Sequence, residues 1–308
     1  MLRIVPDTNI NFIGMRKYAF VVSGLLILVG LVAFVMTAIG NADMGIDFTG
    51  GVMLQGHFQN PVPIDDLRSA ISGSFPDASV AELSDFKMPN AYIVKTKRLD
   101  SESEGREEAA TMKNLMAQRF AGNEFTIVEE HVIGPAVGKD LRKDATWAVI
   151  ISMIGILLYI WMRFDFRFGV AATAATFHDV LGVLGICYVL GFEFNLLFIS
   201  ALLTMAGYSL TDKVVVFDRI RENLQKFRGR TEFVHAINRS INEVLSRTIN
   251  TGMSVLIVLI VLFFFGGEVL RGFSLAMILG ILVSTYGSIF VASPIMVEWE
   301  AHRPSRHK

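Results

Sequence analysis

Long apolar runs dominate the chain outside one polar segment in its first half. Six runs approach or exceed the roughly 20 residues that an α-helix needs to cross a hydrocarbon core. Four of them are free of charged side chains and histidine, whereas His178 and Asp179 interrupt the third run, and Asp212 and Lys213 interrupt the fourth. The pattern predicts a polytopic α-helical membrane protein with six transmembrane helices, over residues 18–42, 145–162, 168–192, 194–217, 248–267 and 272–297.

The polar segment, residues 43–144, has the pattern of a separate α+β domain between the first and second transmembrane helices. The predicted elements follow one another in the order βαββαβ, which is that of the ferredoxin-like split βαβ arrangement. About 100 residues are enough for an independent core. Alternation predicts strands over 51–58, 79–83, 91–96 and 125–133, and three-to-four-residue spacing predicts helices over 63–72 and 104–120.

Composition and charge support this division. Of the 308 residues, 52% are hydrophobic and 19% are charged, with a mean hydropathy of +0.49. Residues 43–144 carry 17 acidic and 11 basic side chains, whereas the remainder carries 12 acidic and 17 basic, so the net charge of −1 is a cancellation. Opposite charge on two regions of one chain indicates two environments.

Lysine and arginine also predict the orientation. Residues 1–17, 163–167, 218–247 and 298–308 together carry 15 of these side chains, against 4 on the opposite side of the predicted helices. Since cytoplasmic loops are enriched in Lys and Arg, both termini are predicted to be cytoplasmic and the acidic domain extracytoplasmic.

The first apolar run has a second interpretation, as a signal peptide, because residues 40–42 resemble a small-residue cleavage site. Its 25 residues exceed the roughly 7–15 of a signal-peptide core, so we expect it to be retained.

Cys187 is the only cysteine, which rules out an internal disulfide and a cysteine-based metal site. Residues 218–247 predict a pair of amphipathic helices on the membrane surface, broken near Gly229.

The ionisable residues within the runs are the candidates for function. Asp179 lies near the middle of its run, where an Asp either serves an ion or proton pathway or bonds a neighbouring helix as packing glue. Asp212 follows Tyr208 and Ser209 by one helical turn, so it either handles protons or marks the fraying end of a span. Lys213 is turned about 100° away from Asp212 on the helix and can snorkel to the cytoplasmic surface, so the two residues need not form a pair.

Arg247 precedes the fifth run and a group of hydroxyl and amide side chains. It either holds a nearby carboxylate ionised or is an ordinary cytoplasmic flank.

Common enzyme motifs are missing: residues 134–139 fall short of a P-loop, no His-Glu-x-x-His occurs, and residues 45–51 lead into a strand rather than a dinucleotide-binding helix. We therefore expect no enzyme activity, no resident metal and no nucleic-acid binding.

Five motifs occur in order at matching topological positions, over residues 45–51, 132–138, 177–179, 208–222 and 245–251. With them the chain resembles, over nearly its whole length, the SecF family, the smaller half of SecDF protein-export complexes. The resemblance implies a bacterial inner-membrane protein of the resistance-nodulation-division superfamily that uses the proton-motive force in late-stage protein export. It implies SecD, the SecYEG channel, YajC, YidC, the translocating preprotein and membrane lipid as partners, and no cofactor beyond the ion gradient.

By motif, Asp212 and Arg247 match the family's proton-conducting acid and arginine, and Asp179 matches its His-Asp motif. We expect protonation of Asp212 to weaken its attraction to Arg247, with sodium as an alternative coupling ion. The rival functions are a small-molecule efflux transporter and a non-conducting assembly factor. The supporting polar network is expected to comprise His178, Tyr208, Ser209, Thr211, Thr248 and Thr251, and the motif at the start of the outer domain Gly45, Asp47, Phe48, Gly50 and Gly51.

Overall fold

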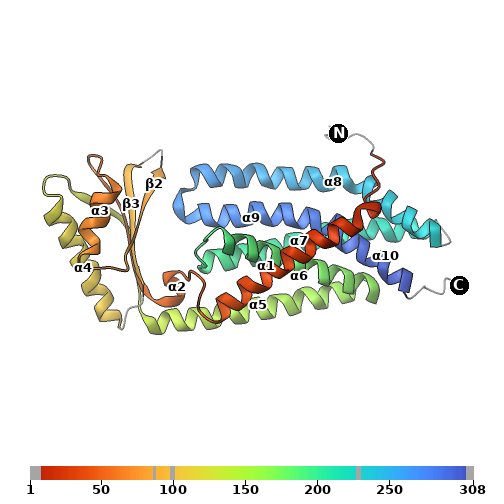
Figure 1. The fold of residues 1–308 in the computed structure, drawn as a ribbon, viewed down its shortest axis with the longest axis horizontal. Coiled ribbons are helices and arrows are strands. Elements are labelled where there is room, and N and C mark those ends of the chain that lie inside the picture. The colour runs from red at the N-terminus through yellow and green to blue at the C-terminus, as the bar shows by residue number, and fades with distance from the viewer. Residues whose placement is uncertain (1–7, 86–87, 98–100, 227–229, 303–308) are drawn as a thin grey trace.

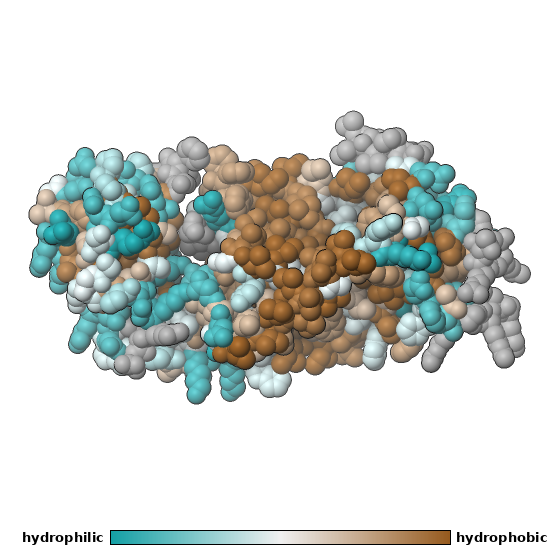
Figure 2. Space-filling view, viewed as in Figure 1, coloured by the Kyte–Doolittle hydropathy of each residue, from teal (hydrophilic) through white to brown (hydrophobic). Residues whose placement is uncertain are grey.

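The computed structural model describes residues 8–85, 88–97, 101–226 and 230–302. It has six helices long and apolar enough to cross a membrane, which confirms the predicted class of multi-pass membrane protein. They run roughly side by side, with a small sheet domain at one end (Figure 1). Hydrophobic residues cover the middle of the molecule in a broad band, and hydrophilic residues gather over both ends (Figure 2).

The six helices correspond one to one to the predicted apolar runs, although several of their bounds differ. The last of them, α9, passes through a π-helical turn at Ser288–Ala292 into α10 (Ser293–His302). The start of α1 and the end of α10 lie at the end opposite the sheet domain (Figure 1). The helices are α1 (Arg16–Ala38), α5 (Pro135–Arg163), α6 (Phe166–Val189), α7 (Leu196–Leu224), α8 (Arg230–Phe265) and α9 (Gly267–Gly287).

Helices α6, α7 and α9 form the interior of the bundle, and α1 crosses α6 closely. A Cβ added at Gly30 of α1 would lie 2.3 Å from the carbonyl oxygen of Leu181, and one added at Gly185 of α6 would lie 2.7 Å from the backbone nitrogen of Gly30. Small residues allow such close approach of helix backbones inside membranes. The two glycines therefore set the distance between α1 and α6.

The outer domain is the predicted ferredoxin-like fold. Its four strands form one antiparallel sheet in the order β2-β3-β1-β4, and α3 (Ile64–Ser72) and α4 (Glu102–Arg119) cover one face. Alternate residues of the central strand, such as Leu54, are buried against Leu67 and Met112 of these helices. The strands are β1 (Gly51–Phe58), β2 (Ser79–Asp85), β3 (Met88–Lys97) and β4 (Phe125–Ile133), and a short helix, α2 (Ile46–Thr49), precedes β1.

Several predicted boundaries differ from the structure, and two regions show the largest differences. Helix α5 begins at Pro135, ten residues before the predicted span, so one continuous helix leads from the outer domain into the bundle. The amphipathic segments of residues 218–247 are continuations of α7 and α8 rather than separate surface helices, and Gly229 lies outside the described residues. Charge marks where the membrane ends, but backbone hydrogen bonding continues across that boundary, so charge alone misplaces helix ends.

Candidate functional site

An ion pair joins α6 and α7 inside the bundle. Lys213 Nζ donates a hydrogen bond of 2.6 Å to Asp179 Oδ2, and both side chains are 0% exposed. Removing charges from water is costly unless they are paired. Lys213 therefore does not snorkel to the surface, the course that its position on the helix left open: its ammonium group turns inward to a buried carboxylate.

Two further side chains complete the shell of Asp179. Ser209 Oγ donates to Asp179 Oδ2 over 2.7 Å and accepts from Lys213 Nζ over 2.6 Å. His178 Nδ1 lies 2.8 Å from Asp179 Oδ1, and because an ionised carboxylate only accepts, Nδ1 carries the hydrogen. His178 Nε2 is buried without a hydrogen-bond partner among the described residues. The carboxylate of Asp179 thus accepts hydrogen bonds from a lysine, a serine and a histidine.

The π-helical turn after α9 lies against the same carboxylate. A Cβ added at Gly287 would lie 2.0 Å from Asp179 Oδ1, so only glycine fits at this point of the helix. Ser288, the first residue of the π-turn, follows at once. Single π-turns within α-helices are frequent at functional sites. Three helices, α6, α7 and α9, therefore meet at Asp179.

Asp212 directly precedes Lys213 on α7 and has different neighbours. Its side chain is buried, and the hydroxyl groups of Thr248 and Ser288 lie beside its carboxylate. Asp212 Oδ2 and both hydroxyl oxygens have no hydrogen-bond partner among the described residues at full hydrogen-bond geometry. Asp179 and Lys213 also act on Asp212 electrostatically. The buried cluster, defined as Asp179, Asp212, Lys213, His178 and Ser209, thus contains two carboxylates and one ammonium group.

Arg247 is not part of the buried cluster in this structure. It is exposed and lines a pocket of about 410 Å³ with Asp218, Arg219, Glu222 and Glu243, and it forms no ion pair with Asp212. Asp218 is instead paired with Arg163 at 2.8 Å. Asp212 and Arg247, which the resemblance implies act together, therefore form no ion pair in this structure.

The side chains of the predicted hydroxyl network differ in burial. Ser209 and Thr248 are buried at the cluster, and Tyr208 is half-buried, with its hydroxyl oxygen 3.6 Å from the position of a Cβ at Gly252. Thr211 and Thr251 are exposed, and their hydroxyls donate to carbonyl oxygens of their own helices. Thr211 therefore makes no contribution to the cluster in this structure, whereas Thr251 also forms a hydrogen bond with the Tyr208 side chain.

The motif at the start of the outer domain forms α2 and the first residue of β1. Gly50 has a φ of 74°, a conformation that favours glycine. A Cβ at Gly138 of α5 would lie 3.0 Å from the nitrogen of Gly50 and 3.3 Å from the carbonyl carbon of Phe48, so α2 packs directly on the start of α5. The same close fit holds for Gly51, where a Cβ would lie 2.2 Å from the carbonyl oxygen of Thr96.

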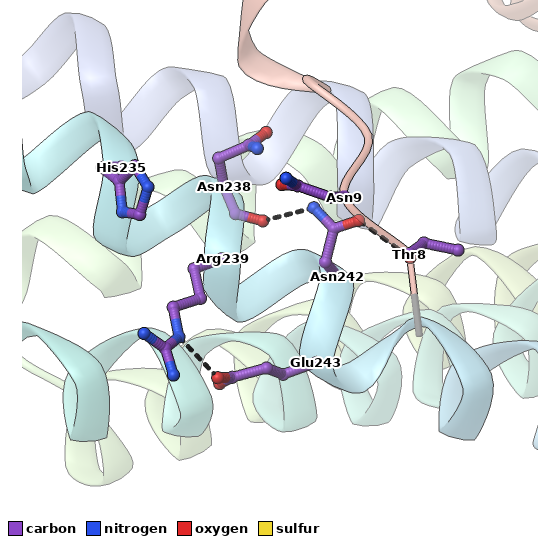
Figure 3. A pocket seen from close by; sticks show the side chains of 7 residues that line it. All are labelled: Thr8, Asn9, His235, Asn238, Arg239, Asn242 and Glu243. Atoms are coloured by element: carbon purple, nitrogen blue, oxygen red, sulfur yellow. Dashed lines mark hydrogen bonds and ion pairs between the residues drawn. The ribbon is translucent and has the colours of Figure 1, made fainter. Parts of the chain in front are cut away.

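A second polar group lies at the end of the bundle away from the sheet. Asn238 and Asn242, one turn apart on α8, hold the backbone of the segment before α1: both side chains donate to the carbonyl oxygen of Ile10, and Asn242 Oδ1 accepts from Ile10 N and from the Thr8 hydroxyl. The pocket beside them has a volume of about 470 Å³ (Figure 3). Glu243, on its wall, binds Arg239 at 2.8 Å. Sequence patterns gave no sign of this clamp.

The comparisons of this sequence with known proteins all match SecF or SecDF proteins. The family model described as protein export membrane protein SecD/SecF, C-terminal, matches residues 112–302. The chain is 47% identical over 299 residues to protein translocase subunit SecF of Thermodesulfovibrio yellowstonii, covering 96% of this chain and 97% of the relative. It is 38% identical to part of protein translocase subunit SecDF of Thermus thermophilus.

Solved structures show the same fold. The crystal structure of SecDF, a translocon-associated membrane protein from Thermus thermophilus, matches with 37% identity and a TM-score of 0.80, covering 96% of this chain. A second SecDF crystal structure, in a super-membrane-facing form, matches with 35% identity and a TM-score of 0.68. The chain spans about two fifths of these longer proteins, 39% and 40% respectively. Sequence and fold agree that this chain belongs to the SecF family of protein translocase subunits.

Proposed function

We propose that the chain couples proton movement across the bacterial inner membrane to late-stage protein export. The observation that carries the proposal is the buried cluster, which has two carboxylates and one ammonium group. An excess negative charge in a low-dielectric interior attracts a proton or another cation. Ionisable side chains inside membrane bundles commonly serve such pathways.

The ion pair makes the helix contact sensitive to protonation. Binding of a proton to Asp179 removes the ionic part of its attraction to Lys213, and the ammonium group then has Asp212, the preceding residue on α7, as its remaining counter-charge. Protonation of Asp212 has the reverse effect and favours the Asp179 pair. A proton passing between the two carboxylates therefore changes the contact between α6 and α7.

Arg247 takes a different place in this scheme from the one expected. Because it is exposed at a pocket with Asp218, Glu222 and Glu243, we assign it to the path between the cluster and the cytoplasm. The energy available is about 2.3 kcal/mol for one charge crossing 100 mV. That is enough to bias a helix shift but too little to unfold a cargo protein.

The surroundings that we propose follow from the relatives. One relative carries the SecF-type region within a longer chain named SecDF, and we infer that this chain pairs with a separate SecD. SecYEG, YajC, YidC and a translocating preprotein are further proposed partners. We place both termini in the cytoplasm and the ferredoxin-like domain in the periplasm, on the basis of the Lys and Arg distribution.

The test is export into inverted membrane vesicles that contain the full chain and SecD. Asp212→Asn keeps the size of the side chain but cannot release a proton, so it is expected to abolish the stimulation of export by a proton gradient while the SecD complex still assembles. Unchanged stimulation would contradict the proposal. A sodium gradient without a pH gradient separates sodium from proton coupling, and loss of the SecD complex would favour the assembly-factor alternative.

A further inference from the structure

The segment that leads into the outer domain is bonded to the loop between α6 and α7. The Phe194 backbone nitrogen donates to the Asp43 carbonyl over 2.7 Å, and the Gly45 nitrogen donates to the Phe194 carbonyl over 2.9 Å. A Cβ added at Gly45 would lie 2.8 Å from the Cβ of Asn195. The close fit leaves room only for glycine and fixes the two segments side by side.

Asp47 extends this contact to the first residue of α7. Its Oδ2 accepts a hydrogen bond of 2.9 Å from the backbone nitrogen of Leu196, where α7 begins. The first backbone N–H groups of a helix lack partners within the helix, and a carboxylate there is also favoured by the helix dipole. Asn195 caps the same helix end by accepting from the nitrogen of Phe198. The outer domain thus supplies part of the cap of α7.

A second attachment connects the sheet to the same loop. Glu193 accepts from Lys95 Nζ at 2.6 Å and lies 3.3 Å from Lys97 Nζ, and Lys97 also binds Asp43 at 2.6 Å. Tyr92 and Val94, which alternate with these lysines on β3, belong to the core beneath the helices. The lysines therefore project from the opposite face of the sheet, toward the bundle.

Helix α7 connects this contact to the buried cluster without interruption. It runs from Leu196 to Leu224 and includes Ser209, Asp212 and Lys213. At about 1.5 Å per residue, the 17 steps from Leu196 to Lys213 correspond to roughly 26 Å of helix. A shift or rotation of α7 at the ion pair must therefore also move its first residue, to which Asp47 is bonded.

We propose that Asp47 is a positioning residue that fixes the outer domain to the start of α7, so that changes at the buried cluster move that domain. The bonds of Glu193 to Lys95 and Lys97 form the second attachment. The inference rests on the proposed proton coupling and adds the route by which the state of the cluster reaches the periplasmic side.

The test measures domain movement and proton flux separately, in liposomes containing the full chain and SecD. Spin labels at Asp77→Cys in the outer domain and Ile257→Cys on α8 report the distance between the domain and the bundle; both positions are exposed, and the native Cys187 is buried. In the parent, a proton gradient is expected to change the distance distribution. Asp47→Ala is expected to reduce that change at least fivefold while proton flux stays within twofold of the parent.

Two matched variants define the role of the carboxylate. Asp47→Asn retains an oxygen acceptor for the Leu196 N–H and is expected to keep at least half of the distance change. Asp65→Ala removes an exposed carboxylate from α3 in the same domain and is expected to keep all of it. If Asp47→Ala does not assemble with SecD, the double variant Lys95→Gln and Lys97→Gln replaces it, with an expected twofold reduction.

Four results would overturn the inference. For Asp47→Ala, they are a gradient-driven distance change equal to that of the parent, or a loss of proton flux together with the loss of movement. The others are a lysine double variant, when it is used, whose distance change equals that of the parent, and a parent that conducts protons without any change in distance. Absence of gradient-driven proton flux in the parent would instead contradict the proposed function. The two failures are thus distinguishable.

Discussion

Lys213 on α7 and Asp179 on α6 form an ion pair of 2.6 Å in which neither side chain has any exposed surface. A buried pair of this kind gives little net stability, because the cost of removing both charges from water offsets most of their attraction. Breaking it by removing one partner is costly, since the other charge is left uncompensated. The pair is therefore better suited to linking charge state to helix position than to holding the fold together.

Lys213→Met is expected to abolish proton-stimulated export, because the ammonium group that responds to both carboxylates is lost. It is also expected to destabilise the bundle, by up to about 3–5 kcal/mol if Asp179 stays ionised. The measurements are gradient-dependent export in vesicles and thermal unfolding of the full chain in mild detergent.

The double variant Lys213→Met with Asp179→Leu serves as the control for stability. With both charges replaced by apolar groups, most of the lost stability is expected to return, whereas export stimulation stays absent. A double variant as unstable as Lys213→Met would show that the two residues are not coupled.

Gly287→Ala tests the contact of the π-turn with Asp179. The new Cβ would lie 2.0 Å from Asp179 Oδ1, so the carboxylate or the helix must shift, at a cost of about 1–3 kcal/mol. We expect a lower unfolding temperature and weaker export stimulation. Gly24→Ala on α1, where a Cβ meets nothing within 4 Å, is the matched control, and an equal effect of both substitutions would contradict the assignment.

The sequence predicted much of the fold because the signals are strong and local. Six apolar runs gave six helices, and alternation with turn residues gave the sheet domain, whose strand order the βαββαβ pattern implies. Asp179 stood out as a candidate because a carboxylate at the middle of a span is costly. These inferences depend on one segment at a time.

The site was harder to predict because it depends on contacts between helices. Lys213 follows Ser209 by four residues and so shares its helix face, but the choice between a buried carboxylate and the membrane surface depends on Asp179 in another helix. Two other contacts also join segments far apart in sequence: the cap that Asp47 provides to α7, and the hydrogen bonds from Asn238 and Asn242 to the segment before α1. Whether Arg247 pairs with Asp212 likewise depends on how two helices pack.

The attachment at Glu193 predicts a pH dependence. Burial alone would raise the pKa of Glu193, but the ammonium groups of Lys95 and Lys97 outweigh it and hold the pKa below its ordinary value. A lowered folded-state pKa means that the stabilisation is complete above the ordinary pKa of about 4.3 and is lost as pH falls through the lowered value. A spin label at Leu190→Cys is expected to become more mobile as the pH falls through this lowered pKa.

Glu193→Gln separates this effect from general acid unfolding. The variant is expected to show the higher label mobility already at neutral pH, with little further change on mild acidification. Identical pH profiles for the parent and Glu193→Gln would mean that another group controls the loop.

Asn242→Ala is expected to release the segment before α1. The side chain accepts from Ile10 N and from the Thr8 hydroxyl and donates to the Ile10 carbonyl, so its loss exposes the Ile10 amide to solvent. Hydrogen exchange at Ile10 should rise by about tenfold or more, which corresponds to about 1.4 kcal/mol of lost protection. Asn9→Ala, which lines the same pocket (Figure 3), should leave the exchange at Ile10 unchanged, and a similar rise in both variants would argue against the clamp.

Proton flux into liposomes that contain the full chain and SecD tests the central claim most directly. Asp179→Asn keeps the shape of the side chain but cannot bind and release a proton, so gradient-driven flux is expected to fall at least tenfold. Asp65→Asn, at an exposed carboxylate of the outer domain paired with Arg68, is the control and is expected to stay within twofold of the parent. Flux through Asp179→Asn equal to that of the parent would contradict proton coupling at the buried cluster.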